Sequence, residues 1–355
     1  MRIGVIAQAP GGPLTSSAWI RLLLPLQRLE RQGLCQLHTL PPLADPASPV
    51  ELPESLDRLI VQRNACPALP QAAALVAACR QRRIPLVFDL DDALFALPAD
   101  HPERQQYAPA LPALDHLLAE VDLRVFSTPT LARLCQERAS LHGYRAGPQT
   151  LLANGLDLEL WGECRGFPRR SGEEPLRLLY VGTTTHQADL DLVLPELDRL
   201  AGRQPGSFQL TVVGGAPSLT PRPWLQVRKV PLSCRRYPHF VRWLQRLPRH
   251  DLGLAPLVAN PFNGAKSNLK LLDYAALGLG CLCSPGPAYE AAIVADLALA
   301  AEPWQWGERL RWAAAHRPQL RRLAQAAHRE LRSIHNSAVM ASGWRAILEG
   351  ATVQV

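Results

Sequence analysis

The residues best suited to binding an anion lie in the stretch from Asn260 to Ser284. Lys266, Lys270 and Asp273 are spaced at i, i+4 and i+7, so on one helix they would project from one face. A helix start after a small-residue loop presents unpaired backbone N–H groups, and two ammonium groups beside it would strengthen the attraction. This stretch therefore predicts a site for a diphosphate.

Helix signals flank these charged residues. Ser267 and Asn268 favour a helix start, while Gly278 and Gly280 favour its end. The apolar run 281–284 that follows is typical of a short buried strand. The stretch is thus predicted to form a loop, a helix N-terminus and a strand.

The choice of lysine supports a phosphate site. Lys229, Lys266 and Lys270 are the only lysines in a chain that otherwise uses arginine. Lysine is a compact point charge on a flexible stem, suited to a phosphate whose charge changes during a reaction. A solvated amphipathic helix with a basic first turn is the alternative, although such a turn opposes the helix dipole.

Two further groups follow predicted strands in the first half of the chain. Asp89, Asp91 and Asp92 repel one another unless a cation, a sugar hydroxyl or an arginine is near, which favours a functional role. Gly11 and Gly12 stand in a Gly-rich loop after the first strand, where open α/β sheets bind ligands. A tight strand-to-helix turn explains the two glycines equally well.

A Gly/Thr loop ends the first strand of the second half. Gly182, Thr183 and Thr184 can donate hydrogen bonds to phosphate or sugar oxygens there. His186 is either a site residue or an ordinary loop histidine. A helix is predicted from about Asp189, with a buried apolar stripe at residues 190, 193, 194 and 197.

Composition describes an ordinary globular chain of 355 residues with a formal charge of +7. No apolar run approaches the roughly 20 residues that span a bilayer, and the N-terminus resembles a strand rather than a signal peptide, which predicts a cytoplasmic protein. The eight cysteines lack metal-type spacing and are expected to be reduced and mostly buried. The charge permits peripheral contact with the inner face of a membrane, whereas no motif supports nucleic-acid binding.

Short apolar runs alternate with helix-length stretches, which predicts α/β architecture with parallel, doubly wound sheets. The alternation stops over 161–175 and then restarts. We therefore expect two Rossmann-like domains facing across a cleft. Their predicted bounds are 1–160 for the first domain, 161–175 for a linker, 176–334 for the second domain, and 335–355 for a helix packing back toward the first domain. Strands are predicted at 2–7, 59–62, 85–89, 123–127, 150–153, 176–181, 210–213, 225–230, 251–255, 280–284 and 297–300.

With these residues in view, the chain resembles family 4 glycosyltransferases of the GT-B fold. The segments 181–186 and 266–278 look like the Gly-containing turn and the acidic-residue helix of the nucleotide-binding half of that family. Segments 88–95, 127–129, 153–157 and 255–257 look like a bacterial branch associated with surface polysaccharide or glycan assembly.

The resemblance implies a role for each matching residue. Asp273 would bind the ribose hydroxyls of a nucleotide-diphosphate sugar. The diphosphate would be held by Gly182, Thr183, Thr184, Lys266, Ser267, Asn268 and Lys270. Gly11, Gly12 and Asp89 would bind the acceptor, with Asp91 or Asp92 orienting or deprotonating its hydroxyl and Lys270 assisting catalysis.

The implied activity is transfer of a sugar to a glycan, lipid-linked or protein acceptor, with retention and with neither a metal nor a separate cofactor. This chain departs from the family pattern at Ala265, where the first of two acids is expected, and at residues 183–185, where an arginine is usual. Two alternatives stay open: a nucleotide-sugar epimerase of the same fold, and a non-catalytic nucleotide- or glycan-binding subunit.

Overall fold

The computed structural model describes residues 1–8, 14–43, 50–164, 166–167, 174–214 and 219–350. By its internal contacts the chain divides into two compact units. Unit 1 comprises 1–157, 265–267 and 336–355, and unit 2 comprises 158–264 and 268–335. The expected linker 161–175 thus belongs to unit 2 in its described part, and the C-terminal helix belongs to unit 1.

Unit 1 contains a six-stranded parallel sheet in the order β2-β1-β3-β4-β5-β6. Its strands are β1 (Arg2–Ile6), β2 (Gln36–Leu40), β3 (Arg58–Gln62), β4 (Leu86–Leu90), β5 (Leu123–Phe126) and β6 (Gln149–Leu151). Its helices are α1 (Ser16–Ala18), the π-helix η1 (Trp19–Leu23), α2 (Leu24–Arg31), α3 (Leu69–Arg82), η2 (Leu94–Ala96), α4 (Arg104–Tyr107), η3 (Ala108–Ala110), α5 (Leu111–Glu120), α6 (Pro129–His142) and α16 (Ser337–Leu348).

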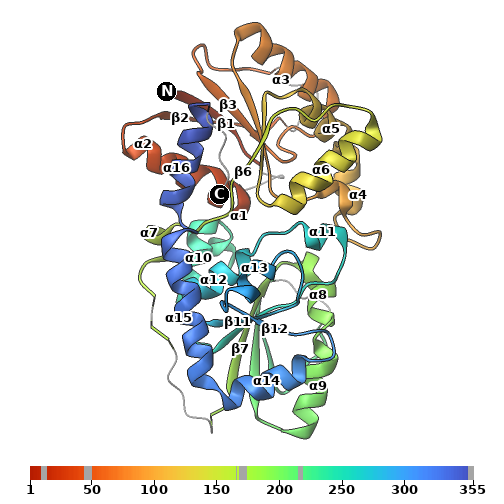
Figure 1. Cartoon of the computed structure of the whole chain (residues 1–355), viewed down its shortest axis with the longest axis vertical. Helices are drawn as coiled ribbons and strands as arrows, with labels where there is room; N and C mark the ends of the chain where they lie inside the picture. Colours follow the sequence, from red (N-terminus) through yellow and green to blue (C-terminus); the bar gives the residue numbers. More distant parts are fainter. Residues whose placement is uncertain (9–13, 44–49, 165, 168–173, 215–218, 351–355) are drawn as a thin grey trace. The chain divides into compact units, whose positions relative to one another are not determined.

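Helices cover both faces of this sheet (Figure 1). Alternate strand residues such as Ile3, Val5 and Ile60 form one core with α2 and α16. Helices α3 and α5 pack against each other on the opposite face. A helix joins most consecutive strands, which is the connection that parallel pairing requires.

Unit 2 repeats this plan with the strand order β12-β11-β10-β7-β8-β9. Its strands are β7 (Leu176–Gly182), β8 (Phe208–Gly214), β9 (Leu225–Arg228), β10 (Leu252–Ala255), β11 (Gly280–Cys283) and β12 (Leu299–Ala300). Its helices are α7 (Leu158–Trp161), η4 (Thr184–His186), α8 (Gln187–Asp191), α9 (Leu194–Arg203), η5 (Leu232–Cys234), α10 (Tyr237–Gln245), α11 (Pro261–Gly264), α12 (Leu269–Leu277), α13 (Glu290–Val294), α14 (Trp306–Ala315) and α15 (Arg317–Ser333).

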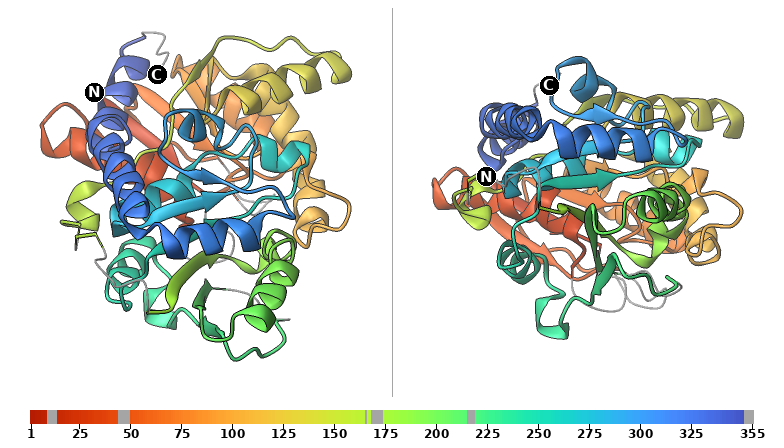
Figure 2. Two further views of the ribbon diagram at one scale, coloured as in Figure 1. Left: turned by 60° about the horizontal axis from the view of Figure 1, so that its bottom comes forward. Right: turned by 90° about the horizontal axis from the view of Figure 1, so that it is seen from below.

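The core of unit 2 includes the apolar stripe expected after Asp189. Leu190, Val193, Leu194 and Leu197 are all buried and pack with the strands and with α14. Figure 2 shows the green helix α9 near the blue α14. On the other face, α12 packs on β10 and β11 and against α15. All the predicted strands are present, and β2 is the one strand of the described residues that the sequence did not predict.

A buried ion pair ties unit 1 together. Arg21 donates from Nη2 to Asp89 Oδ1 at 2.6 Å, and both side chains are wholly buried. The same guanidinium donates to the Leu152 carbonyl and to Asn154 Oδ1, at 3.0 and 2.8 Å. Trp344 of α16 donates to the Arg21 carbonyl at 2.6 Å. Arg21 therefore joins a helix, the end of β4, the segment after β6 and the C-terminal helix.

Removing only one member of this pair should be costly. Arg21→Met leaves the Asp89 carboxylate buried without its cation, and we expect a loss of about 3–5 kcal/mol in the free energy of unfolding. The double variant Arg21→Met/Asp89→Leu should recover most of that loss, because no buried charge remains. Urea denaturation of wild type and both variants measures this. A single variant that costs less than about 1 kcal/mol would show that the pair does not hold the unit together.

Candidate functional site

The helix α12 carries two of the residues predicted to bind the donor. It lies close to β10 because Gly253 has no side chain: a Cβ there would come within 2.3 Å of the Tyr274 ring. The Tyr274 hydroxyl donates to the Leu254 carbonyl at 2.7 Å. The helix ends as predicted at Gly278, whose φ of 75° suits glycine.

One sequence prediction about this helix is wrong. The helix begins at Leu269, with Asn268 in the N-cap position, so Lys266 lies before it and does not share a helix face with Lys270 and Asp273. Residue spacing alone does not show where a helix starts, so the prediction included Lys266, which precedes the helix. Only Lys270 and Asp273 project from α12.

Lys270 and Asp273 have unequal environments. The Lys270 ammonium lies 5.5 Å from the centroid of the Tyr180 ring, a cation–π distance. The Asp273 side chain is partly buried, and its Oδ1 atom has no hydrogen-bond partner among the described residues. Burial raises the pKa of Asp273 to about 7, while Lys270 lowers it. Asp273 is thus a carboxyl with an unused acceptor atom that a ligand hydroxyl could satisfy.

The Gly/Thr turn after β7 meets α12 at the same tyrosine. A Cβ on Gly182 would come within 2.9 Å of the Tyr180 ring, so the tyrosine packs directly on this turn. The Tyr180 hydroxyl donates to the His186 carbonyl at 3.3 Å. The hydroxyls of Thr183 and Thr185 are 2.7 Å apart, and the Thr184 side chain lies outside the described residues. The structure therefore brings the Gly182 turn and Lys270 together around Tyr180.

Asp189 is a residue of this region whose importance the sequence did not indicate. Its Oδ1 accepts hydrogen bonds from the Val258 amide at 2.8 Å and from Asn263 Nδ2 at 3.0 Å. Its Oδ2 lies 2.8 Å from His186 Nδ1. Asp189 is buried and joins the Gly182–His186 turn to the loop that precedes Lys266. The sequence NPFNG at residues 260–264 offered a signal, since its second Asn, Asn263, supplies one of these hydrogen bonds.

The short segment 265–267 belongs to unit 1. The Thr128 hydroxyl donates to the Ala265 carbonyl at 2.8 Å, and Asn154 Nδ2 donates to Ser267 Oγ at 2.8 Å. Ala265 itself is wholly buried. The residues on both sides of Lys266 are therefore held by side chains that follow β5 and β6 of unit 1.

The predicted carboxylates of unit 1 lie in a connected polar cluster. Arg63 contacts Asp91 through Nε at 3.4 Å and Asp92 through Nη2 at 3.0 Å. Ser17 donates a short hydrogen bond to Asp91 Oδ2. Burial raises the pKa of Asp91; Arg63 opposes that shift and Asp92 adds to it. Asp91 is thus a carboxyl whose proton affinity is increased, as a general base requires.

Three buried oxygens in or beside this cluster accept no hydrogen bond in the described part of the chain, although Asp91 Oδ1 forms the ion pair with Arg63. Gln8 Oε1, Gln62 Oε1 and Asp91 Oδ1 accept no hydrogen bond from the described residues. They come from the ends of β1, β3 and β4, at one edge of the sheet. An edge rich in acceptor atoms suits a ligand that brings hydroxyl donors.

Two predictions for acceptor binding have a different outcome. Gly11 and Gly12 lie outside the described residues. Asp89 is wholly buried, with Arg21 and Gln62 bound to its carboxylate. This burial places Asp89 beneath the Asp91 cluster, where it supports the edge rather than presenting an oxygen to solvent.

The described residues lack two features, a cluster of metal-ligating side chains and a membrane-spanning helix. They contain no group of three or more His, Cys, Asp or Glu side chains arranged to hold a metal ion. Among them, no helix combines the length and the apolar character needed to cross a membrane. All eight cysteines are free, and six of them are buried as expected.

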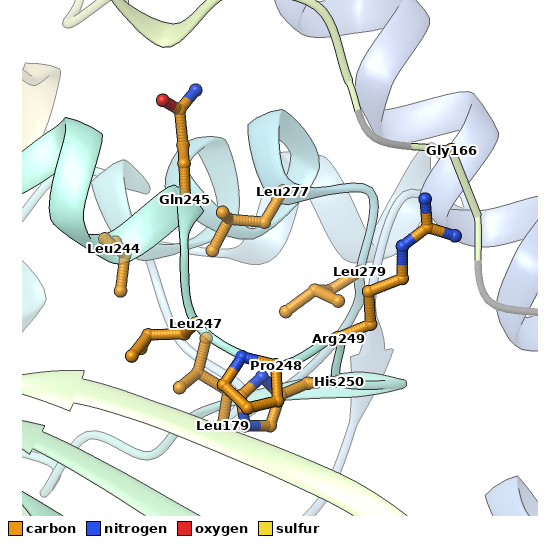
Figure 3. Close-up of a pocket in the computed structure, with 10 residues that line it drawn as sticks. All are labelled: Gly166, Leu179, Leu244, Gln245, Leu247, Pro248, Arg249, His250, Leu277 and Leu279. Atoms are coloured by element: carbon orange, nitrogen blue, oxygen red, sulfur yellow. The ribbon is translucent and has the colours of Figure 1, made fainter.

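A pocket in unit 2 lies away from these residues (Figure 3). It is lined by Gly166, Leu179, Leu244, Gln245, Leu247, Pro248, Arg249, His250, Leu277 and Leu279. Arg249 and His250 precede β10, and Leu279 precedes β11, so the pocket lies at the amino ends of these strands. Ligands of open α/β sheets bind at the carboxyl ends, where Gly182 and the start of α12 are found.

No family model matches this chain, and no curated protein matches its sequence. Solved structures do match it. The sucrose-phosphate synthase of Thermosynechococcus elongatus has a TM-score of 0.65 at 12% identity, covering 98% of each chain. HepE of Anabaena in complex with UDP-glucose has a TM-score of 0.63 at 11% identity, covering 98% of this chain and 99% of that chain.

An alpha,alpha-trehalose-phosphate synthase (UDP-forming) of Burkholderia vietnamiensis also matches, with a TM-score of 0.55 at 13% identity, covering 82% of this chain and 72% of that one. At such identities the likeness concerns the fold. Together with the two six-stranded parallel sheets, it confirms the predicted GT-B fold. Membership of family 4 stays a prediction.

The pKa of Asp273 predicts how stability depends on pH. The folded carboxyl keeps its proton up to about pH 7, whereas an ordinary Asp loses it near 3.8, so the free energy of unfolding should fall as pH rises between these values. Asp273→Asn removes this loss. At pH 8 the substitution should raise the free energy of unfolding by about 2 kcal/mol. This is about half of what the full pKa shift implies, because the Asp273 side chain is partly exposed.

Thermal unfolding of wild type and Asp273→Asn at pH 4 and pH 8 measures the effect. The variants should differ at pH 8 and agree near pH 4. The exposed Glu290→Gln is the control and should change neither melting temperature by more than a degree or two. Equal melting temperatures of wild type and Asp273→Asn at pH 8 would contradict the raised pKa.

Proposed function

We propose that this protein is a glycosyltransferase that moves a sugar from a nucleotide-diphosphate sugar to an acceptor hydroxyl. One observation carries the proposal: Tyr180 gathers the Gly182 turn and Lys270 at the carboxyl end of the unit 2 sheet, with the unsatisfied carboxyl of Asp273 on the same helix. The fold supports it, because HepE is bound to UDP-glucose and the Burkholderia synthase is UDP-forming.

The donor nucleotide is assigned to unit 2 and to the adjoining segment 265–267. The ribose hydroxyls would donate to Asp273, whose Oδ1 lacks a partner in the described structure. Lys266, Lys270 and the backbone amides at Ser267 and Asn268 would hold the diphosphate. The turn Gly182 to Thr184 would face the same group.

The chemistry follows from where charge develops. As the sugar–phosphate bond breaks, negative charge grows on the leaving diphosphate, and the two ammonium groups stabilise it more strongly than in the ground state. Lys270 therefore acts in catalysis as well as in binding. The lysines supply the positive charge, so the proposed reaction is metal-independent, uses no further cofactor and retains the configuration of the sugar, as the resemblance to family 4 implies.

The acceptor is assigned to the polar cluster of unit 1. Its hydroxyl would donate to Asp91 or Asp92 and would lose its proton to one of them as it attacks the sugar carbon. Arg63 contacts both carboxylates, and its guanidinium opposes the rise in the pKa of Asp91. Asp89 and Arg21 fix the end of the strand that presents Asp91. Gly11 and Gly12 are proposed to line the same site.

We place the acceptor among the glycans, lipid-linked molecules and proteins of polysaccharide assembly in the cytoplasm. A lipid-linked acceptor requires the chain to work at a membrane surface, so peripheral membrane contact is part of this proposal. A second candidate is a non-catalytic nucleotide-binding subunit. It is favoured by one observation: Ala265, in the position of the missing acid, is wholly buried.

Nucleotide binding should depend on Lys270. A panel of nucleoside diphosphates and sugar nucleotides should contain one that raises the melting temperature of wild type, equivalent to about 2.7 kcal/mol at a hundredfold excess over Kd. Lys270→Ala should lose most of that shift. Lys229→Ala is the matched control, because Lys229 is an exposed lysine of the same unit, and its shift should equal that of wild type. If no nucleotide at millimolar concentration raises the melting temperature of wild type or of either variant, the proposed donor site is wrong.

Transfer should depend on one of the two carboxylates of unit 1. Asp91→Asn and Asp92→Asn should both keep the nucleotide-dependent thermal shift, and the one that accepts the proton should lose about 10²–10⁴-fold in kcat. The assay follows release of nucleoside diphosphate from the stabilising sugar nucleotide. The exposed Asp100→Asn is the control. Nucleotide binding by wild type without any turnover or epimerisation across an acceptor panel would establish the non-catalytic subunit instead.

A further inference from the structure

Positive charge in this chain is concentrated in one segment of unit 2. Between Leu225 and His250 there are seven Lys and Arg residues and no Asp or Glu. The whole chain has 38 basic and 31 acidic residues, so the rest of the chain is electrically balanced. The formal charge of +7 is therefore the charge of this segment.

All seven side chains are exposed. They form what we call the basic surface, which consists of Arg228, Lys229, Arg235, Arg236, Arg242, Arg246 and Arg249. It runs from the edge strand β9 through η5 to α10 and the segment before β10. The next acidic residue, Asp251, is buried and lies 3.4 Å from Arg317, so it does not neutralise the surface.

The fold fixes which way α10 presents its charges. Tyr237, Val241 and Leu244 are buried, which turns the Arg242 and Arg246 positions outward, one helix turn apart. Next to the helix, His239 Nδ1 lies 3.1 Å from the Ser233 carbonyl and holds η5 against it. The surface is thus built on packed elements.

An apolar side chain stands within the basic surface. Leu232 is 74% exposed, although a leucine contributes most when it is buried. It lies between Lys229 and Arg235 in sequence, on η5 beside α10. The half-buried rings of Phe240 and Trp243 pack together on the same helix, with centroids 6.1 Å apart. Arginine with an exposed leucine and a partly exposed tryptophan is the combination found where proteins enter the headgroup region of a membrane.

We propose that the basic surface binds an anionic lipid bilayer, with Leu232 inserted among the headgroups. Lipid phosphates complement a segment that carries seven exposed cations and no acid of its own, and the bilayer also covers the exposed leucine. Duplex nucleic acid would use the cations but would leave Leu232 in water. The proposed membrane contact depends on the proposed function at a single point, because a lipid-linked acceptor would be presented at that bilayer.

The test uses the full chain and co-sedimentation with vesicles. Wild type should sediment with vesicles of phosphatidylcholine and phosphatidylglycerol, and should stay in the supernatant with phosphatidylcholine alone. Raising the salt from roughly 0.1 M to 1 M shortens the Debye length from about 10 to about 3 Å and should release most of the protein.

Charge-reversal variants locate the contact. Arg235→Glu/Arg242→Glu should lower the partition coefficient by at least about 25-fold, because removal of each positive charge lowers it about fivefold. Arg322→Glu/Arg329→Glu changes the net charge equally on the exposed side of α15 and should retain most of the binding. Leu232→Ser leaves the charge unchanged and should weaken binding by about threefold or more, as loss of a buried apolar side chain predicts.

Three results would overturn the proposal. These are wild type that fails to sediment with anionic vesicles at low salt, equal losses in the α10 and α15 variants, and tighter binding to duplex DNA than to vesicles. The nucleotide-dependent thermal shift is measured on the same variants and should stay at the wild-type value. Vesicle binding without any nucleotide shift would refute the donor site alone, and a nucleotide shift without vesicle binding would refute the basic surface alone.

Discussion

A charge buried at the end of a parallel strand must be neutralised, and in unit 1 the Arg21–Asp89 pair meets this requirement. Asp89 lies at the end of β4, and its carboxylate also accepts from Gln62 at the end of β3. Arg21 reaches the segment after β6, and its carbonyl is bound by Trp344 of α16. Because these bonds fix the carboxyl edge of the sheet, Asp91 emerges at a defined place beside Arg63.

Unit 2 treats the carboxyl groups of Asp189 and Asp273 in opposite ways. Asp189 has its Oδ1 bound by Val258 and Asn263 and its Oδ2 beside His186, so it stabilises the loops that surround the site. Asp273 lies on a helix where its Oδ1 has no partner among the described residues, and burial raises its pKa to about 7. An unsatisfied buried carboxyl reduces stability, and a hydroxyl-bearing ligand would offset that cost.

The sequence predicted what local patterns can express. Buried parallel strands are continuous apolar runs and were found. In contrast, β2 was missed because an edge strand with polar, partly exposed residues lacks such a run. Lys266 was predicted to lie on the helix because residue periodicity does not show at which residue a helix begins. Arg21 and Asp189 were missed because their partners are distant in sequence: Asp89 lies 68 residues from Arg21, and Val258 lies 69 residues from Asp189.

The buried Ala265 bears on how a sugar could be recognised here. Its side chain is wholly enclosed, and its carbonyl is bound by Thr128. A glutamate at this position would need repacking of its neighbours and a partner for its charge, so a single substitution would not restore the acid of the family pattern. In the proposed transferase, contacts to the donor sugar would then come from other groups. The loop from Val258 to Gly264, which Asp189 holds, precedes Ala265 and is one segment of unit 2 that would supply them.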